Sequence, residues 1–417
     1  MRIGLLSYRS NPFSGGQGIY VRHLSSALNK LGHEVEVLSG PPYPLLDKNI
    51  KLVRIPSLDL FSTNERLKAF NISFLNSLTD FIEWAGVLSG AFPEPYTFGR
   101  RVSQYLQDKK SYYDIIHDNQ SLSYSLVKLQ KEFPLVTTIH HPITRDHRIE
   151  VENSKNWIEK LSSNRWHSFL KMQKKVAPQL EKIICPSNQS KSDVIREFKV
   201  QEKRVEAILN GIDLDTFRYK QGIKKVPFRI ITSASADIPL KGLRFLIEAL
   251  PKVLLDFPET CLSVIGKAKE KGEITKLITK LDLKGKISFH SELSEIEIVN
   301  LYSSAQIAVI PSLYEGFGFG AGEALACSLP LISTHSGGLK EVVGEAAIQI
   351  KSGDAKEISM AIIDLFSNPE KQAYYSRLGR ERMESEFDWL KAAEEYVKIY
   401  EEVINRFSMR SNVYNKI

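Results

Sequence analysis

Two glutamates stand eight residues apart in a glycine-rich stretch, YEGFGFGAGEALA, that runs from Tyr314 to Ala326. These carboxylates, Glu315 and Glu323, could act as the acid and the base or nucleophile of a glycosidase. They could equally accept hydrogen bonds from hydroxyl groups, because an ionised carboxylate offers two acceptor oxygens. A metal pair is a third use, but no histidine or aspartate stands nearby to complete its ligands. The residue types alone leave the first two uses open.

The residues on either side predict how this stretch is held in place. The run IAVIPS (307–312) has the composition of a buried strand, YEGFG (314–318) that of a tight loop, and FGAGEALAC (319–327) that of a short helix. We therefore expect Glu315 in the loop and Glu323 in the first turn of the helix. Since the helix dipole favours a carboxylate in that turn, a purely structural role for Glu323 is the alternative.

Two further glycine-containing stretches could bind an anion. In NPFSGGQG, the adjacent Gly15 and Gly16 lie between a predicted strand and a predicted helix, where free N–H groups stabilise negative charge. The pattern is not GxGxxG and no acidic ribose partner follows, so a tight turn without a ligand is the alternative. Lys241 and Gly242 begin a predicted helix in the second half of the chain, where the lysine could reach a phosphate as a point charge. A solvated lysine at a helix end is an equally good interpretation.

Histidines follow two of the predicted strands. His140 and His141 end the strand VTTIHH, and His117 ends DIIH. The carboxyl ends of parallel strands face the ligand crevice in α/β folds, so these side chains could line a binding site. A histidine that only terminates a strand or forms part of a turn is the alternative for each of them.

The order of these elements predicts an α/β fold with two doubly wound sheets. Strand, glycine loop, helix and strand follow one another near the N-terminus, and the alternation begins again after the polar segment YKQGIKKV (219–226). A chain of 417 residues is long enough for two domains, and we place their boundary between residues 220 and 221. Residues 41–110, which mix prolines with aromatics, are expected to be irregular, and residues 389–407 to form a long helix.

The composition is that of a globular protein, with 42% hydrophobic and 25% charged residues. We expect neither a signal peptide nor a membrane-spanning segment, because the N-terminus runs directly into a strand and the most apolar stretch (72–98) is broken by charges and prolines. The three cysteines lack CxxC spacing and suit a reducing compartment, so a cytoplasmic location is expected. A net charge of +7 favours an anionic partner, while the lack of a recognisable motif argues against nucleic acid.

In its motifs the chain resembles the retaining glycosyltransferases of family 4, the glycogen-synthase-like group 1 enzymes of the GT-B fold. The resemblance extends over nearly the whole chain and is strongest from Lys182 onward. Its marks are GGQGIYVRHLSSAL, TTIHH, ICPSNQSKSDVI, ILNGIDLDTF, PLKGLRFLIEAL, IPSLYEGFGFGAGEALA and STHSGGLKEVV. Two glutamates separated by seven residues become a specific signal when NGID and KG precede them and GG follows.

The resemblance implies two Rossmann-like domains that face each other across a cleft. Residues 1–220 would form the acceptor-side domain and residues 221–388 the nucleotide-sugar-binding domain, while a helix over 389–417 would pack back on the first. The implied activity is the retaining transfer of a hexose-type sugar from a UDP-, GDP- or ADP-sugar to a glycan, lipid or small-molecule acceptor. Neither a cofactor nor a metal ion would be needed.

The resemblance also assigns roles to individual residues. His140 would lie next to the transferred sugar, Lys241 would pair with the donor diphosphate, and Glu315 would hold hydroxyls of the donor sugar. Glu323 would hold the ribose hydroxyls. The remaining donor-binding residues would be Gly15, Gly16, Gly316, Phe317 and Gly318.

The chain departs from the family pattern at one position. An arginine usually stands five residues before the lysine, and here Ala236 occupies that place. Because a charge-assisted hydrogen bond contributes about 1.5–3 kcal/mol, we expect another group to replace it, such as Arg9, Arg244 or a helix N-terminus. A nucleotide-sugar-binding homologue with weak or no activity, and another GT-B enzyme such as a sugar-nucleotide epimerase, are the alternatives.

The acceptor is not defined by these motifs. A basic, tryptophan-containing stretch (157–175) and an aromatic segment (81–98) could place the first domain on an anionic membrane, which would imply a lipid acceptor at the inner membrane face. Ordinary core helices with a solvated face are the alternative.

Overall fold

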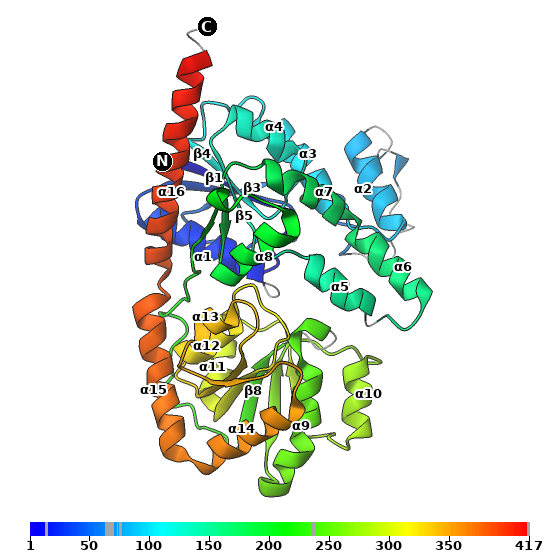
Figure 1. The fold of residues 1–417 in the computed structure, drawn as a ribbon, viewed down its shortest axis with the longest axis vertical. Coiled ribbons are helices and arrows are strands. Elements are labelled where there is room, and N and C mark those ends of the chain that lie inside the picture. Colours follow the sequence, from blue (N-terminus) through cyan, green and yellow to red (C-terminus); the bar gives the residue numbers. More distant parts are fainter. Residues whose placement is uncertain are drawn as a thin grey trace. The chain divides into compact units, whose positions relative to one another are not determined.

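The structure, a computed structural model, describes residues 1–12, 16–62, 71–72, 74, 77–152, 154–234 and 238–414 (Figure 1). The chain divides into two compact units. Unit 1 comprises Met1–Leu209 together with Trp389–Ile417, and unit 2 comprises Asn210–Asp388.

Unit 1 is built on a parallel sheet that, in the described part of the chain, has seven strands in the order β3-β2-β1-β4-β5-β6-β7. The chain order changes direction between β1 and β4, which is the switch point at which doubly wound sheets bind their ligands. Apolar runs form these strands because both sheet faces are covered, and β4 and β5 are buried throughout. The strands are β1 Arg2–Ser7, β2 Glu34–Ser39, β3 Lys51–Arg54, β4 Ile115–Asn119, β5 Leu135–Thr138, β6 Ile183–Cys185 and β7 Val205–Ala207.

Helices flank the unit 1 sheet on both sides (Figure 1). Helix α1 shows why they form: its buried residues include Tyr20, Leu24 and Leu28, spaced at one side of a helix of 3.6 residues per turn. The α-helices are α1 Gly16–Lys30, α2 Leu78–Leu88, α3 Glu94–Leu106, α4 Ser125–Glu132, α5 Thr144–Glu152, α6 Trp157–Trp166, α7 Leu170–Val176, α8 Asn188–Phe198 and α16 Trp389–Tyr414. Short 3-10 turns are η2 His167–Phe169, η3 Ala177–Gln179 and η4 Glu202–Arg204.

Unit 2 repeats the architecture with a parallel sheet of six strands among its described residues, in the order β10-β9-β8-β11-β12-β13. The strands are β8 Arg229–Ser233, β9 Cys261–Ile265, β10 Ile287–His290, β11 Ile307–Ile310, β12 Leu331–Thr334 and β13 Ile348–Ile350. The helices are η5 Pro239–Lys241, α9 Leu243–Asp256, α10 Glu273–Lys280, α11 Glu295–Ser304, α12 Phe319–Ala326, α13 Leu339–Val343, α14 Ala355–Ser367 and α15 Pro369–Glu386. Two parallel Rossmann-type sheets confirm the predicted fold class.

The prediction of an irregular segment over residues 41–110 is wrong in part, because the segment contains β3, α2 and α3. Strand β3 lacks a clear pattern since it is a short edge strand that, among the described strands, pairs with β2 alone. The side chains of β3 are partly buried or exposed. Pro93 and Pro95 mark the start of α3, where a proline is tolerated because the first N–H groups of a helix have no intrahelical partner.

The last helix, α16, belongs to unit 1 and lies along α1 (Figure 1). Its Tyr396 hydroxyl accepts a hydrogen bond of 2.9 Å from the Tyr20 hydroxyl, and its Tyr400 hydroxyl lies 2.6 Å from Nδ1 of His117. All four side chains are fully buried, so α16 supplies hydrogen-bond partners to buried polar atoms of β4 and α1.

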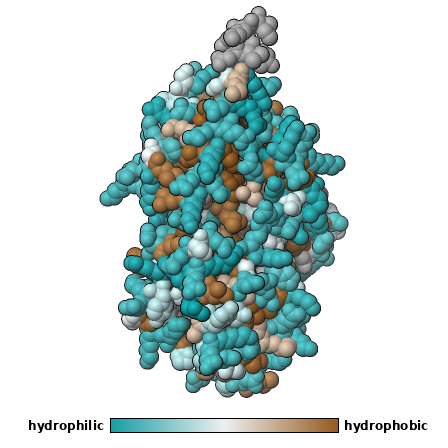
Figure 2. All heavy atoms as spheres, turned by 60° about the vertical axis from the view of Figure 1, so that its left-hand side comes forward, coloured by the Kyte–Doolittle hydropathy of each residue, from teal (hydrophilic) through white to brown (hydrophobic). Residues whose placement is uncertain are grey.

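The face shown in Figure 2 is dominated by hydrophilic residues, and apolar residues gather on it in separate patches. Within the described ranges, no helix combines the length and the apolar composition that crossing a bilayer requires.

Candidate functional site

The loop that carries Glu315 is fixed by glycines from a second loop of unit 2. The Gly338 N–H donates to the Glu315 carbonyl at 2.8 Å. A Cβ atom on Gly337 would lie 2.1 Å from that same carbonyl oxygen, and one on Gly338 would lie 2.3 Å from the Gly316 carbonyl. Only glycine therefore permits this approach, which explains why the GG of STHSGG accompanies the glutamate loop in the sequence.

Glu315 and Lys241 are brought together although they are far apart in the sequence. Lys241 Nζ lies 2.7 Å from Glu315 Oε1, and the Ser312 hydroxyl donates to the same oxygen at 2.9 Å. Lys241 is held by Gly242, whose φ of 62° and close approach to Pro311 exclude a side chain there. An ammonium group and a carboxylate in contact can separate to bind an anion and a set of hydroxyls respectively.

Glu323 lies in the same unit, but not where we expected it in the helix. Helix α12 begins at Phe319, so Glu323 is its fifth residue, and the prediction of a first-turn position is wrong. The helix starts directly after Gly318, whose φ of 112° ends the loop, so the first turn is complete before the glutamate. Burial raises the pKa of Glu323 to about 7, and the Tyr302 hydroxyl donates to Glu323 Oε2 at 3.3 Å.

The remaining predicted residues of this loop can contribute only backbone groups. The Phe317 side chain is buried and packs against Phe319 and Phe387, with ring centroids 5.0 Å and 6.0 Å away. Gly316 and Gly318 have no side chain to offer. Among the residues that the structure describes, no three His, Cys, Asp or Glu side chains group as metal ligands.

His140 lies in unit 1, at the carboxyl end of β5, and is held by β4. Its Nε2 is 2.6 Å from Asn119 Oδ1, and its backbone N–H donates to Gln120 Oε1 at 2.6 Å. The Ser190 hydroxyl donates to its carbonyl at 2.8 Å. The Tyr20 ring stands nearly perpendicular to the imidazole at 4.7 Å. Burial, together with the charge of the adjacent histidine, lowers the pKa of His140 to about 3.

The surroundings of His117 favour a structural role in the core over a place in a binding site. It is fully buried, and its two ring nitrogens lie 2.6 Å from the Tyr400 hydroxyl and 2.8 Å from the Thr138 hydroxyl. Burial lowers its pKa to about 3, so the ring stays neutral in the core.

Two positions that the sequence singled out, Gly15 and Ala236, lie outside the described residues. Gly16 is the exposed first residue of α1. Of the arginines considered as replacements for the missing cation, Arg244 pairs with Glu248 at 2.8 Å and Arg9 with Glu94 at 3.1 Å.

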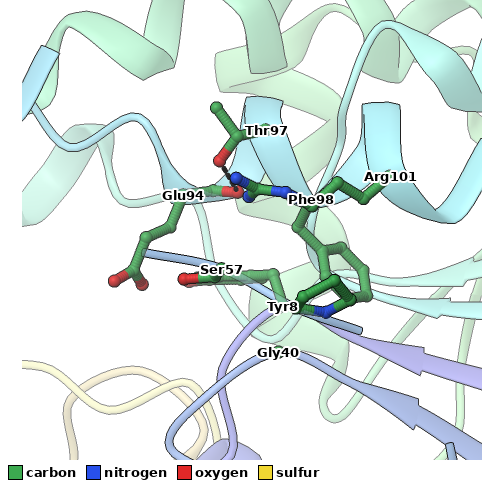
Figure 3. A pocket seen from close by; sticks show the side chains of 8 residues that line it. Tyr8, Gly40, Ser57, Glu94, Thr97, Phe98 and Arg101 are labelled. Carbon is green, nitrogen blue, oxygen red and sulfur yellow. Dashed lines mark hydrogen bonds between the residues drawn. The ribbon is translucent and has the colours of Figure 1, made fainter. Parts of the chain in front are cut away.

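A small pocket lies beyond the carboxyl ends of β1, β2 and β3 (Figure 3). Tyr8, Gly40 and Ser57 line it together with the first two turns of α3, where Thr97 bonds the Glu94 carbonyl. Its volume of about 10 Å³ holds roughly one water molecule, too little for a sugar. Burial raises the pKa of Glu94 to about 7 in spite of its Arg9 partner.

The sequence did not point to four of the residues that support these side chains. Ser312 and Tyr302 bond the two glutamates, and Asn119 and Gln120 bond His140. For the last two a signal existed, because two consecutive amide side chains stand at the end of a buried strand. Tyr302 gave no such signal, since a tyrosine on a helix is usually part of the core.

Two family models match the chain. The model for glycosyl transferases group 1 matches residues 215–382, and that for glycosyltransferase family 4 matches residues 14–216. The MMP α-(1→4)-mannosyltransferase of Mycolicibacterium hassiacum is 38% identical over 411 residues, which cover 97% of this chain and 99% of that protein.

Solved structures share the fold at low sequence identity. The sucrose-phosphate synthase from Thermosynechococcus elongatus has a TM-score of 0.75 and 21% identity, and the match covers 97% of this chain and 99% of that one. Anabaena HepE in complex with UDP-glucose has a TM-score of 0.69 and 16% identity, over 96% of this chain and all of that one, 100%. The chain thus belongs to the group 1 glycosyltransferases of family 4 and is a glycosyltransferase of the GT-B fold.

Proposed function

We propose that the protein transfers a mannosyl residue from a nucleotide-diphosphate mannose to a hydroxyl group of its acceptor, with retention and without a metal ion. The observation that carries the proposal is the grouping of Lys241, Ser312 and Glu315 in unit 2. It supplies one cation for a diphosphate and one oriented carboxylate for sugar hydroxyls.

The ion pair between Lys241 and Glu315 supplies both charges that the donor would need. The two charged groups lie 2.7 Å apart and neutralise each other. When the donor binds, the ammonium group would turn to the diphosphate and stabilise the negative charge that develops on the leaving group. Glu315 would then accept from sugar hydroxyls, still held by the Ser312 hydroxyl. Glu323 would accept from the ribose hydroxyls, His140 would contact the sugar, and Gly15, Gly16, Gly316, Phe317 and Gly318 would offer backbone groups.

The choice of mannose rests on the relatives. The relative at 38% identity is named a mannosyltransferase that forms an α-(1→4) linkage, and a Corynebacterium glutamicum relative, 29% identical over 38% of this chain, is named GDP-mannose-dependent. Structural neighbours in complex with UDP, UDP-glucose and ADP favour a nucleotide-sugar donor in general. An α-linked product from an α-linked donor corresponds to retention, which extends the proposal to the stereochemistry.

A donor screen tests the proposal. The protein is incubated with GDP-mannose, UDP-glucose and ADP-glucose, with manno-oligosaccharides as acceptors and with EDTA present, and release of the nucleoside diphosphate is measured. We expect release from GDP-mannose to exceed that from the others, and the anomeric proton signals of the product to show an α linkage. Release only from a glucose donor would overturn the choice of mannose, and loss of activity with EDTA would overturn the metal-free reaction. Binding without release from any donor would favour a nucleotide-sugar-binding homologue.

We also propose that unit 1 contacts an anionic membrane at the cytoplasmic face. Helix α6 has no buried residue, and its Trp157, Ile158 and Leu161 are 73%, 60% and 60% exposed. It lies beside α2 (Figure 1), where Arg165 donates to the Ser89 carbonyl at 3.2 Å. Exposed apolar side chains with an interfacial tryptophan, next to exposed lysines of α7, are typical of a membrane-surface helix.

Cosedimentation with anionic liposomes tests the membrane contact. The change is the charge reversal of exposed lysines on α7, namely Lys171→Glu, Lys174→Glu and Lys175→Glu. The matched control reverses three exposed lysines of unit 2, namely Lys252→Glu, Lys276→Glu and Lys284→Glu. We expect salt-sensitive binding that the first triple variant weakens and the control keeps. Equal binding by both variants, or no binding by the wild type, would contradict the contact.

A further inference from the structure

His140 forms its hydrogen bonds with residues of neighbouring elements. Its backbone N–H and carbonyl are bonded to Gln120 and Ser190, and its ring Nε2 to Asn119. The neutral imidazole of such a histidine has a single tautomer if the partner of its ring nitrogen is fixed as a donor or as an acceptor. We propose that Asn119 is a positioning residue that holds His140 as the Nε2–H tautomer, so that Nδ1 accepts a hydrogen bond from a hydroxyl of the donor sugar.

The hydroxyl of Ser7 orients the Asn119 amide. Its single proton has two acceptors within reach, the Arg9 carbonyl at 3.2 Å and the Ser10 hydroxyl at 2.6 Å, and either serine hydroxyl can donate to the other. Asn119 Nδ2 donates to the Ser7 oxygen at 3.2 Å. Ser7 is fully buried, so its hydroxyl depends on these three partners.

The orientation of the Asn119 amide determines which of its atoms faces His140. Because the Nδ2 group donates to Ser7, the Oδ1 atom faces His140 Nε2 at 2.6 Å. A carbonyl oxygen has no proton to give, so Nε2 must be the donor. The neutral ring then carries its lone pair on Nδ1. Among the described residues, none forms a hydrogen bond with that Nδ1 atom.

The plane of the His140 imidazole is held by Tyr20 and Gln120. The Tyr20 ring crosses the imidazole at 83°, with the centroids 4.7 Å apart. The Tyr20 hydroxyl is itself anchored 2.9 Å from both the Thr138 and the Tyr396 hydroxyls. The Gln120 side chain holds the main chain of both histidines. Its Oε1 accepts from the His140 N–H, and its Nε2 donates to the His141 carbonyl at 2.9 Å. The direction of the Nδ1 lone pair is therefore fixed by the fold.

This tautomer decides which part of a ligand the histidine can recognise. An Nδ1 lone pair accepts from a hydroxyl and repels a phosphate oxygen, whereas an Nδ1–H group could donate to either oxygen. The inference rests on the proposed function, since it assigns the sugar rather than the diphosphate to His140. It also means that the side chain orients the sugar and does not deliver a proton to the leaving group.

Nuclear magnetic resonance of the full chain, labelled with ¹⁵N only in its histidines, tests the tautomer directly. The resonances of His140 are identified by their loss in His140→Gln. At neutral pH we expect one unprotonated Nδ1 and one protonated Nε2. In Asn119→Asp the new carboxylate favours the doubly protonated ring, and in Asn119→Ala the tautomers mix. The titratable groups that face the ring are His117, His141 and Tyr20, and these substitutions leave all three in place.

The matched control is Asn164→Asp, because Asn164 Oδ1 lies 2.8 Å from His147 Nε2 in an exposed pair of the same kind. It should alter the His147 resonances and leave those of His140 unchanged. An Nδ1–H tautomer in the wild type, or unchanged His140 resonances in both Asn119 variants, would overturn the proposal. Circular dichroism is used to check that each variant is folded. If Asn119→Asp does not fold, Asn119→Ala alone decides the test.

Turnover of GDP-mannose supplies the second readout. We expect Asn119→Ala to lower kcat/KM about tenfold, the loss of one oriented hydrogen bond, while the dissociation constant of GDP itself stays unchanged. A tenfold loss of GDP affinity would place His140 at the diphosphate and overturn the assignment to the sugar. If no donor is turned over, the proposed function fails, whereas the tautomer is still established or overturned by the resonances alone.

Discussion

Replacing Glu323 by glutamine should change the pH dependence of stability by a defined amount. The Glu323 side chain is 9% exposed, and its burial raises the pKa from 4.5 to about 7. The folded protein therefore binds more protons than the unfolded chain between these two pH values. Its stability falls as the pH rises through this window, because the carboxyl group must ionise in a buried position.

The size of the effect follows from the two pKa values of Glu323. One pKa unit corresponds to about 1.4 kcal/mol, so the difference between 4.5 and about 7 amounts to about 3 kcal/mol. Glutamine has no proton to lose. The free energy of unfolding of Glu323→Gln, relative to that of the wild type, should thus rise by about 3 kcal/mol from below pH 4.5 to above pH 7.

Urea denaturation of both proteins over this pH range measures the difference. The exposed Glu345→Gln serves as the control, and its difference from the wild type should stay flat. A flat difference for Glu323→Gln as well would refute the reasoning, since Glu323 would then ionise as easily in the folded protein as in the unfolded chain. Under the role proposed for Glu323, nucleotide affinity measured without urea over the same pH range should drop in Glu323→Gln at high pH, where the wild-type carboxylate would accept from ribose hydroxyls.

Three further outcomes are expected. Lys241→Met should lower kcat/KM about ten- to hundredfold with unchanged melting, because the charge-assisted bond proposed between Lys241 and the diphosphate is lost. The exposed Lys340→Met should have no effect on nucleotide release. Tyr400→Phe should lower the free energy of unfolding by about 1–3 kcal/mol, since His117 Nδ1 loses its partner, and Tyr374→Phe, at a tyrosine 52% exposed, should not. Gly242→Ala should destabilise more than Gly222→Ala in a thermal melt, because both glycines have positive φ but only the first would place its Cβ 2.0 Å from the Pro311 carbonyl.

The parts of the fold that could be predicted from the sequence are those encoded by short-range patterns. Buried strands followed by glycine loops and amphipathic helices predict the two doubly wound sheets, because each signal lies within a few residues of the next. The glutamate loop was predicted for the same reason. Strand β3 was missed because an edge strand without a buried face has no pattern to read.

The supporting side chains could not be predicted because they depend on which strands are neighbours. Asn119 meets His140 because β4 and β5 are adjacent and Asn119 lies in register with Thr138, so the residues that end the two strands lie side by side. The pairing of Tyr302 with Glu323 likewise joins two helices separated by a strand. No local pattern contains that information, although the two amides at the end of β4 could have drawn attention to the position.

The route of the chain through unit 1 has a consequence for biosynthesis. A ribosome makes the seven-strand sheet of the described chain first, then all of unit 2, and helix α16 only after unit 2. Until α16 leaves the exit tunnel, His117 and Tyr20 lack the Tyr400 and Tyr396 hydroxyls that satisfy them in the finished protein. A nascent chain that stalls before Trp389 would thus present an incomplete first unit to chaperones and proteases, even after its second unit has folded. The tyrosines of α16 thus complete the hydrogen bonds of unit 1 only after unit 2 has been made.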